Sequence, residues 1–528
     1  MALYCEQAAN DAYFAFHLAH EEEVCSLEDF RFFVALFRPQ SFEQDEEQRC
    51  SLDKIREESL TRQAELESNL RKRIFDVLED LANGFRDYPT NEITKQDFPA
   101  LYDNSLIFLY RLLFGLYAES RGLLPVKPSG YGSSKIYREK FSLARLVKTL
   151  REKNSFPSEA FTDLYDDLLK LFRLINGDKP EQNEECKVTR YNGGLFNPSL
   201  HKQIEKWRVS DNALANVLRQ LIFAQPPARS SARQQQIVTD ETIDYGLLEV
   251  RQLGDIYEGL LGAILEVNDK ARLELRNANG ENHRHGIFYT PDWVVCYFIR
   301  EALQPLIAEI EKSPEVQPAL KAKSDEKKRD NSFALAVLRL NVCDPAMGSG
   351  HFIVRTTEWL AEQIVYHPTT RTMTEKIVHT GDKKRTKEDI VKAGKIPVPP
   401  GASQEFAEIA YWRRRVVEAC IYGVDVNPLA VELAKLSLWL TCIAADEPLN
   451  FLDHHLRTGN SLLWANPDEM KHLPLSSEAD RKQVTFNIGA KLSQAVQAVI
   501  AENLSIEEIA STEMELVKKK ETRWKAVR

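Results

Sequence analysis

Two short turns in the last third of the sequence carry residues that could hold a nucleoside-bearing ligand. The first, DPAMGSG at 344–350, joins the carboxylate of Asp344 to two glycines, Gly348 and Gly350. Glycines let the backbone approach a ligand closely, and a carboxylate accepts hydrogen bonds. The second, YGVDVNP at 422–428, places Asp425 where an acid could accept hydrogen bonds from both hydroxyls of a ribose. Together the two turns predict a binding site for a nucleoside-bearing cofactor.

The same turns disfavour other nucleotide sites. A dinucleotide-binding turn has the pattern G-x-G-x-x-G, and here the third glycine position is Ile353. The phosphate-binding pattern G-x-x-x-x-G-K-[ST] does not occur in the sequence. A cofactor without a pyrophosphate therefore suits the turns better than NAD or a nucleoside triphosphate does.

The elements around the turns must bring them together. The pattern predicts a strand over 338–343, a helix over 350–366, a strand from Cys420, a helix from Pro428 and a short strand leading into RTGNSLL at 457–463. Strands that alternate with helices at this spacing are typical of a parallel sheet. In such sheets ligands bind beyond the carboxyl ends of the strands, where both turns would lie.

Four segments resemble one enzyme family, in the family's order. DPAMGSG resembles the first motif of S-adenosylmethionine-dependent adenine-N6 DNA methyltransferases, and GIFYTPDWVVCYFI at 286–299 is similar to the motif that precedes it in the gamma-ordered members. YGVDVNPLAVELAKLSLWL and RTGNSLL resemble the second and third motifs. LYRLLFGLYAESRGLLP at 109–125 and YNGGLF at 191–196 are similar to the helical connector of the large restriction-modification (type IIG-like) and BREX-type phage-defence methyltransferases.

The resemblance implies S-adenosylmethionine as the cofactor and a set of residues that bind it. One group would border the methionine end of the cofactor, a second would cradle it, one acid would hold the ribose, and one amide, where the family often has Asp, would face the adenine. In that order they are Tyr289, Thr290 and Pro291; Asp344, Pro345, Ala346, Met347, Gly348 and Gly350; Asp425; and Asn460.

The catalytic turn of the family has no counterpart in the sequence. The family presents a flipped adenine to an [Asn/Asp/Ser]-Pro-Pro-aromatic turn that follows the third motif. Here Pro-Pro occurs only at 226–227 and 399–400, and Asn466 is followed by one proline and no aromatic residue. We therefore assign no catalytic residue. The sequence predicts the cofactor-binding part of a larger enzyme, truncated before its catalytic turn and target-recognition domain, and we assign no nuclease.

The predicted fold class is α/β, with a mostly helical N-terminal and middle region followed by a partial Rossmann-like methyltransferase domain. The predicted boundaries are a helical N-terminal region at 1–125, a helical connector at 126–280, the methyltransferase domain at 281–470 with an insertion at 367–405, and a truncated helical insertion at 471–528. A helix near 102–121 is expected to start at an Asp103 or Asn104 cap and to end before Gly122. Its apolar run at 106–118 contains Arg111 and is shorter than the ~20 residues of a membrane span, so it predicts a buried helix and no membrane partner.

Composition sets limits on partners and location. The 528 residues carry a net charge of −10, so contact with double-stranded DNA would need local basic patches. The stretch 371–395 holds eight basic and four acidic residues, which suits either a solvated loop or a contact with the DNA backbone. Eight scattered cysteines without a C-x-x-C pair favour a reducing, cytoplasmic location. His283 with His285, and His454 with His455, lack a third ligand at suitable spacing, so no metal site is predicted.

The leading interpretation is the cofactor-binding portion of a site-specific adenine-N6 DNA methyltransferase of a restriction-modification or phage-defence system. Its partners would be double-stranded DNA and a separate C-terminal half or defence-system subunits. An alternative is a catalytically inactive S-adenosylmethionine-binding remnant or subunit that needs a separate catalytic and target-recognition half. A methyltransferase acting on RNA or on small molecules is a weaker third interpretation, because the helical connector resembles only the DNA-acting group.

Overall fold

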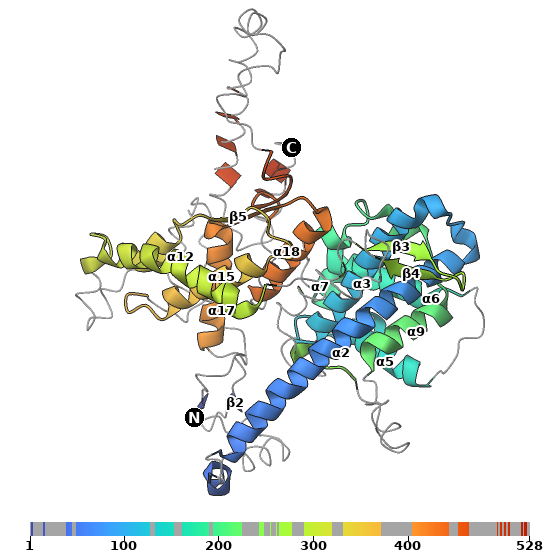
Figure 1. Ribbon diagram of the computed structural model, residues 1–528, viewed down its shortest axis with the longest axis horizontal. Coiled ribbons are helices and arrows are strands. Elements are labelled where there is room, and N and C mark those ends of the chain that lie inside the picture. Colours follow the sequence, from blue (N-terminus) through green and yellow to red (C-terminus); the bar gives the residue numbers. More distant parts are fainter. Residues whose placement is uncertain are drawn as a thin grey trace, which may run out of the picture.

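The computed structural model of the chain describes most of residues 49–463 and short pieces on either side (Figure 1). The longer described ranges are 38–44, 49–126, 133–152, 161–188, 194–223, 242–247, 263–276, 290–318, 331–370, 404–442 and 452–463. Within them helices predominate, and the sheets are small. The predicted mixture of a mostly helical part and an α/β part is confirmed at this level.

We call the helices α2 to α9 and the hairpin β3–β4 the helical body. Its long helices pack side by side around one buried cluster of apolar side chains, and the hairpin covers α2 and α3 (Figure 1). The helices are α2 (Ser51–Asp87), α3 (Phe98–Ser120), α4 (Lys135–Lys140), α5 (Leu143–Glu152), α6 (Asp163–Asn176), α7 (Pro180–Cys186), α8 (Lys202–Lys206) and α9 (Asp211–Ile222). The strands are β3 (Ile264–Val267) and β4 (Leu273–Arg276), which pair antiparallel, and 3-10 turns lie at η1 (Pro39–Phe42), η2 (Pro89–Asn91), η3 (Lys95–Asp97), η4 (Gly194–Phe196) and η5 (Tyr245–Leu247). Near the N-terminus, β1 (Ala2–Leu3) pairs with β2 (Phe14–Ala15).

Helix α3 starts earlier than its sequence predicts. It begins at Phe98, with Pro99 in its first turn, where the missing N–H of proline leaves no bond unmade. Asp103 and Asn104, the predicted caps, lie inside the helix, and Asn104 is buried. The predicted end is confirmed, because the helix stops at Ser120 and Gly122 follows with φ of 68°.

Arg111 in the middle of α3 is buried and bonded, which explains how an apolar helix tolerates it. Its Nε donates to the carbonyl oxygen of Leu195 at 2.8 Å, and its guanidinium lies over the rings of Phe172 and Phe196 at 5.4 and 5.7 Å. Burial lowers its pKa to about 10. Arg111 therefore joins three segments of the helical body.

No helix among the described residues is long and apolar enough to cross a membrane.

The predicted boundary at residue 125 stays a prediction. One cluster of buried side chains draws on both sides of it, from Leu70 in α2 through Phe108 in α3 to Leu168 in α6 and Leu275 in β4. These two stretches of sequence therefore share a core.

We call the elements from α12 to β7 the sheet body. Its strands β5 (Val342–Asp344), β6 (Ile421–Asp425) and β7 (Leu456–Thr458) form a parallel sheet in the order β5-β6-β7. Its helices are α12 (Asp292–Lys312), α14 (Ser332–Val337), α15 (His351–Val365), α17 (Gln404–Cys420) and α18 (Pro428–Thr441). The predicted strand–helix alternation around the two turns is confirmed, except that the first strand begins at Val342, because α14 and a turn occupy 332–340. Helix α17, which packs along α15, is not among the predicted elements.

Helix α18 belongs to both bodies, and Figure 1 shows it between them. Leu433, Leu436 and Leu440 join the core of the helical body, whereas Ala434 and Leu438 join the core of the sheet body. The ring of Trp439 also stacks on Phe114 of α3, with centroids 5.1 Å apart. A helix buried on two sides is apolar all round, which explains the run PLAVELAKLSLWL.

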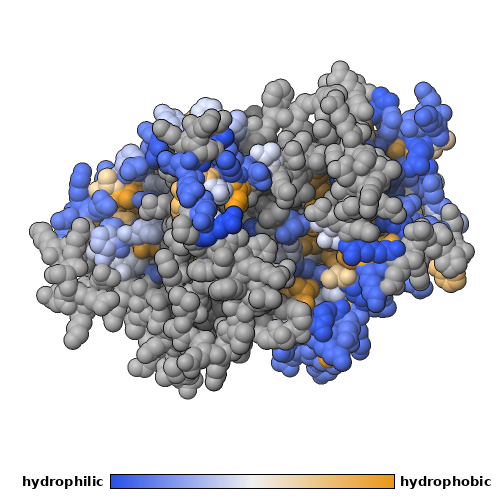
Figure 2. Space-filling model, turned by 90° about the horizontal axis from the view of Figure 1, so that it is seen from below, coloured by the Kyte–Doolittle hydropathy of each residue, from blue (hydrophilic) through white to orange (hydrophobic). Residues whose placement is uncertain are grey.

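On the face shown in Figure 2, hydrophilic residues cover most of the described surface, and hydrophobic residues appear as separate patches between them. Patches of this size are ordinary on a folded protein, because polar groups alone cannot cover its surface. Among the described residues on this face, the apolar patches are therefore separate from one another.

Candidate functional site at the carboxyl ends of the strands

The carboxyl ends of the three parallel strands bring the predicted turns to one edge of the sheet. In the register of the sheet, Asp344 lies opposite Gly423, and Asp425 lies opposite Thr458. The turn 345–350 follows β5, the turn 426–427 follows β6, and the turn 459–463 follows β7. All three turns therefore leave the sheet at the same edge.

Asp425 ties the turns to one another. One of its carboxylate oxygens, Oδ2, accepts a hydrogen bond from the backbone N–H of Gly348 at 2.9 Å, and Oδ1 accepts one from the N–H of Asn427 at 2.8 Å. Its backbone oxygen accepts from the N–H of Gly459 at 2.9 Å. Each carboxylate oxygen can accept a further bond. The side chain is partly exposed, so it remains able to receive donors from a ligand.

The turn 345–350, which we call the glycine turn, depends on two glycines whose backbone is left-handed. Gly348 has φ of 54° and Gly350 has φ of 93°, a region that favours glycine. A Cβ on Gly350 would lie 3.1 Å from Cβ and 3.2 Å from Cα of Ala434, so the turn lies directly against α18. Within the turn, the N–H of Gly350 donates to the carbonyl oxygen of Met347 at 2.8 Å. The turn is thus held by its own backbone and by a neighbouring helix.

Met347 points away from solvent, into the sheet body. Its side chain is buried and lies on Gly423, where a Cβ would overlap its sulfur atom. Its N–H donates to the carbonyl oxygen of Val424 at 3.1 Å. Met347 thus anchors the turn, and the neighbouring Pro345 and Ala346 are the exposed residues of the segment.

Asp344 lies partly buried at the end of β5. Its Oδ1 accepts from the N–H of Ala346 at 3.0 Å. Burial raises the pKa of its carboxyl; the hydrogen bond from Ala346 opposes this rise, and the negative charge of Asp425 adds to it. Two carboxylates that repel each other at a partly exposed edge favour a ligand with positive charge.

Asn460 is exposed and shapes the turn after β7. Its Oδ1 accepts from the N–H of Leu462 at 3.0 Å, and its backbone oxygen accepts from the N–H of Leu463 at 3.1 Å. Close to the predicted site residues in sequence, three apolar side chains are strongly exposed: Val426 by 72%, Leu462 by 90% and Trp293 by 72%. Val426 and Leu462 therefore place apolar surface in the turns after β6 and β7, and Trp293 places it in the first turn of α12.

The Thr-Pro turn lies beside the glycine turn, and the side chain of Asp292, which is not among the predicted site residues, makes the contact. Thr290 and Pro291 are exposed and directly precede α12, and Tyr289 lies outside the described residues. Asp292, the next residue, accepts from Nε2 of His351 at 3.1 Å and from Nε of Arg355 at 2.8 Å. The sequence feature that could have predicted this contact is an acid directly after Thr-Pro, together with a His and an Arg four residues apart on one face of a helix.

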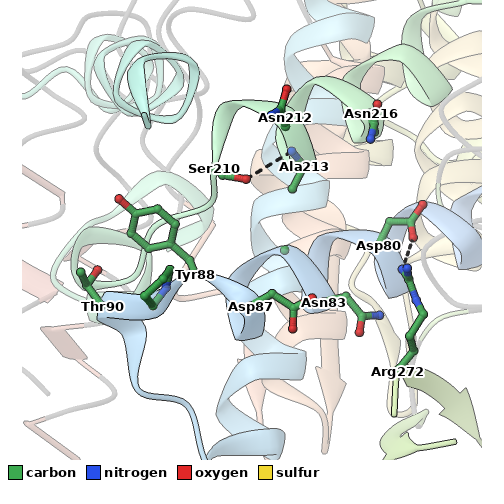
Figure 3. Close-up of a pocket in the computed structure, with 12 residues that line it drawn as sticks. Asp80, Asn83, Asp87, Tyr88, Thr90, Ser210, Asn212, Ala213, Asn216 and Arg272 are labelled. Carbon is green, nitrogen blue, oxygen red and sulfur yellow. Dashed lines mark hydrogen bonds and ion pairs between the residues drawn. The ribbon is translucent and has the colours of Figure 1, made fainter. Parts of the chain in front are cut away.

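A separate cavity of about 750 Å³ lies in the helical body, between α2 and α9 (Figure 3). Asp80 on its wall pairs with Arg272 at 2.9 Å and accepts from Gln220 at 2.9 Å. The amide of Asn83 exchanges two hydrogen bonds of 2.9 Å with the backbone of Leu273. These groups serve the contact between α2, α9 and β4. None of the predicted cofactor-binding residues lines this cavity.

The paired histidines, for which no metal site is predicted, lie partly inside and partly outside the described residues. His455 is buried, its Nδ1 is 2.6 Å from the carbonyl oxygen of Ile421, and its ring stacks on Tyr422. His283 and His285 lie outside the described residues, as does the basic stretch 371–395. Among the residues that the structure describes, no group of three or more His, Cys, Asp or Glu side chains could hold a metal ion.

Comparison with known proteins points to one kind of enzyme. The chain is 22% identical over 458 residues to a Methanocaldococcus jannaschii protein, RM.MjaORFECS2P, that has been assigned as a type II restriction enzyme and methyltransferase. This chain is similar to a restriction-modification protein. The match covers 80% of this chain and 31% of that protein, so the chain spans about a third of the relative's length.

Two further comparisons add little. The type IIL restriction-modification enzyme MmeI, solved in complex with DNA, aligns with a TM-score of 0.39 at 16% identity over 75% of this chain and 41% of that chain, a likeness too distant to place any residue. No protein-family model matches the chain.

Proposed function

We propose that this chain is the S-adenosylmethionine-binding portion of a site-specific adenine-N6 DNA methyltransferase in a restriction-modification or phage-defence system. The observation that carries the proposal is the hydrogen bond from the N–H of Gly348 to the carboxylate of Asp425. This bond joins the glycine turn to residues 425–427, which we call the acidic turn, at the carboxyl edge of a parallel sheet. The similarity to a restriction-modification protein supports the same class. The sheet body would then be part of a Rossmann-like domain, with the boundaries predicted above.

The residues at the strand ends fit S-adenosylmethionine. Asp425 has acceptor capacity for two ribose hydroxyls, and the glycine turn gives close backbone approach. Asp344 and Asp425 place negative charge where a sulfonium cation would be favoured. Val426 and Leu462 offer apolar contact for a purine ring. Asn460 would face the adenine, and the Thr290–Pro291 turn would border the methionine end of the cofactor. When bound, the cofactor would supply an activated methyl group, and the protein would contribute mainly by holding it in place.

The transfer itself would need groups from outside this sequence. No Asn-Pro-Pro-aromatic turn occurs among the 528 residues, so we propose that a further stretch of polypeptide or a partner subunit holds the flipped adenine. Double-stranded DNA would be the substrate, with the basic stretch 371–395 as one contact with its backbone.

A calorimetric titration tests the proposed cofactor. S-adenosylmethionine should bind saturably at one site per chain, and NAD should not bind, because the turns lack the pyrophosphate pattern. Incubation with methyl-labelled cofactor and mixed-sequence DNA should give no labelled DNA from this chain alone. Binding of NAD in preference to S-adenosylmethionine would refute the cofactor assignment, and labelled DNA would refute the need for further groups.

Asp344 should make binding depend on pH. Because the pKa of Asp344 is raised, its carboxyl takes up a proton at a higher pH than an ordinary carboxyl group, whose pKa is about 4. Affinity for the cationic cofactor should therefore fall as the pH is lowered from neutrality toward that range. Asp344→Asn should weaken binding at neutral pH by about fivefold, ~1 kcal/mol, and should flatten the pH dependence.

Asp344→Asn should raise the stability of the free protein, although it lowers the affinity for the cofactor. A carboxyl whose pKa is raised on folding binds its proton more tightly in the folded protein, so its ionised form destabilises the fold at neutral pH. Asp344→Asn should therefore raise the thermal unfolding midpoint of the free protein at neutral pH, by an amount that shrinks as the pH falls. A variant that loses both stability and affinity would show a structural role for Asp344 instead.

A further inference from the structure

Helix α12 begins beside the glycine turn, and one carboxylate makes the connection. Asp292 is the first residue of α12, directly after Thr290 and Pro291, and His351 is the first residue of α15, directly after Gly350. Nε2 of His351 lies 3.1 Å from Oδ1 of Asp292. The carboxylate therefore lies close to the N-terminal ends of two helices, where negative charge is favoured.

Arg355 holds the same carboxylate at two points. Its Nε donates to Oδ1 of Asp292 at 2.8 Å, and its Nη2 donates to Oδ2 at 3.1 Å. Such a two-point pair fixes direction as well as distance, which a single contact or a lysine cannot do. Because the two residues are 63 positions apart, the pair is a tertiary contact between helices.

Arg355 is itself held by a second acid. Its Nη1 donates to Oε2 of Glu358 at 2.7 Å, and Oε1 of Glu358 lies 3.8 Å from Nη2 of Arg413 in α17. Burial lowers the pKa of Arg355, but Glu358 and Asp292 outweigh burial and raise it, so the side chain stays charged. The pair with Asp292 is thus one end of a partly buried network that crosses α12, α15 and α17.

We propose that Asp292 and Arg355 are positioning residues, which hold the Thr290–Pro291 turn against the glycine turn and so set the affinity for the cofactor. This inference rests on the function proposed above. Neither side chain needs to touch the cofactor. Their effect is on the distance between two backbone turns that come from different parts of the sequence.

The first test is cofactor affinity in four variants. Asp292→Asn and Arg355→Gln should each weaken binding of S-adenosylmethionine by about fivefold, and the double variant should be little weaker than either single one, because both changes break the same contact. Arg355→Lys should fall between wild type and Arg355→Gln, since it keeps the charge and loses the two-point geometry. Additive losses, or losses below twofold, would overturn the proposal.

The matched control is another ion pair of the sheet body. Glu315, just after α12, pairs with Arg339, just before β5, at 3.0 Å, and both side chains are largely exposed. Glu315→Gln removes one ion pair between comparable segments away from the glycine turn. Its affinity for the cofactor should equal that of wild type, and an equal loss there would assign the effect to general stability.

A second measurement needs no cofactor, so the proposal can fail separately from the proposed function. The N–H groups of Val295 and Val354 bond to Pro291 and Gly350, the last residues of the two turns. In Asp292→Asn, hydrogen exchange should speed up in peptides covering both 291–298 and 346–354, with no change in the helical body. If exchange at 346–354 stayed at the wild-type rate, the pair would not hold the glycine turn, whether or not the cofactor binds. Failure of wild type to bind cofactor would instead refute the proposed function.

Discussion

Replacing Asp425 with alanine is expected to weaken the binding of S-adenosylmethionine by about tenfold or more, which corresponds to about 1.4 kcal/mol. The variant removes the acceptors proposed for the ribose hydroxyls. It also removes the hydrogen bonds from the N–H groups of Gly348 and Asn427, so the glycine turn loses its side-chain link to β6 and keeps the backbone bond from Met347 to Val424. Titration calorimetry of the wild-type and variant chains measures the change.

One further variant separates the loss of acceptors from the loss of side-chain size, and a second serves as a control. Asp425→Asn keeps the size of the side chain and one carbonyl acceptor, so it should retain part of the affinity. Asp269→Ala, in the exposed turn between β3 and β4, removes a carboxylate in the helical body and should bind as wild type does. If a folded Asp425→Ala protein bound the cofactor with wild-type affinity, the acidic turn would not be part of the site.

The second large effect is expected at Gly350. Gly350→Ala should lower the free energy of unfolding by roughly 2–4 kcal/mol, because a left-handed backbone strains an alanine and the new Cβ meets α18. The distance of 3.2 Å to the backbone atom Cα of Ala434 cannot be relieved by a side-chain rotation. Chemical denaturation followed by circular dichroism should show the loss, and cofactor binding should fall with it.

Gly459→Ala is the matched control for this experiment. Gly459 also follows a strand of the same sheet, but its φ is not left-handed, and an added Cβ would lie 3.8 Å from Cγ1 of Val424, an ordinary contact. Its stability should stay within about 0.5 kcal/mol of wild type. Equal losses in the two variants would mean that strain at Gly350 is not what limits substitution there.

Much of the sheet body could be predicted, because its signals are local. The run that ends at Asp344, the helix after Gly350 and the helix after Pro428 were recognisable from turn residues and apolar patterns, and the structure contains all of them. The start of α3 was misplaced, because an acid or an amide can cap a helix or lie within it, and here Asp103 is exposed and Asn104 is buried inside the helix. Helix α17 was not predicted at all.

The candidate site could be predicted as a set of residues, but only in part as a geometry. The positions of Asp344 and Asp425 at strand ends followed from sequence, since parallel strands end at the same edge. The direction of Met347 did not, because a side chain in a turn can face either way, and here the space over Gly423 admits it.

By itself, the sequence determined the two turns, the order of strands and helices around them, and the absence of an Asn-Pro-Pro-aromatic turn from these residues. Only the tertiary structure decided that α18 is shared by two cores, with Trp439 on Phe114, and that Asp292 meets Arg355 across 63 positions. The physical reason is the range of the interactions. Turn conformation and helix periodicity depend on neighbours within a few residues, whereas ion pairs and ring contacts depend on which distant surfaces the packed chain brings together.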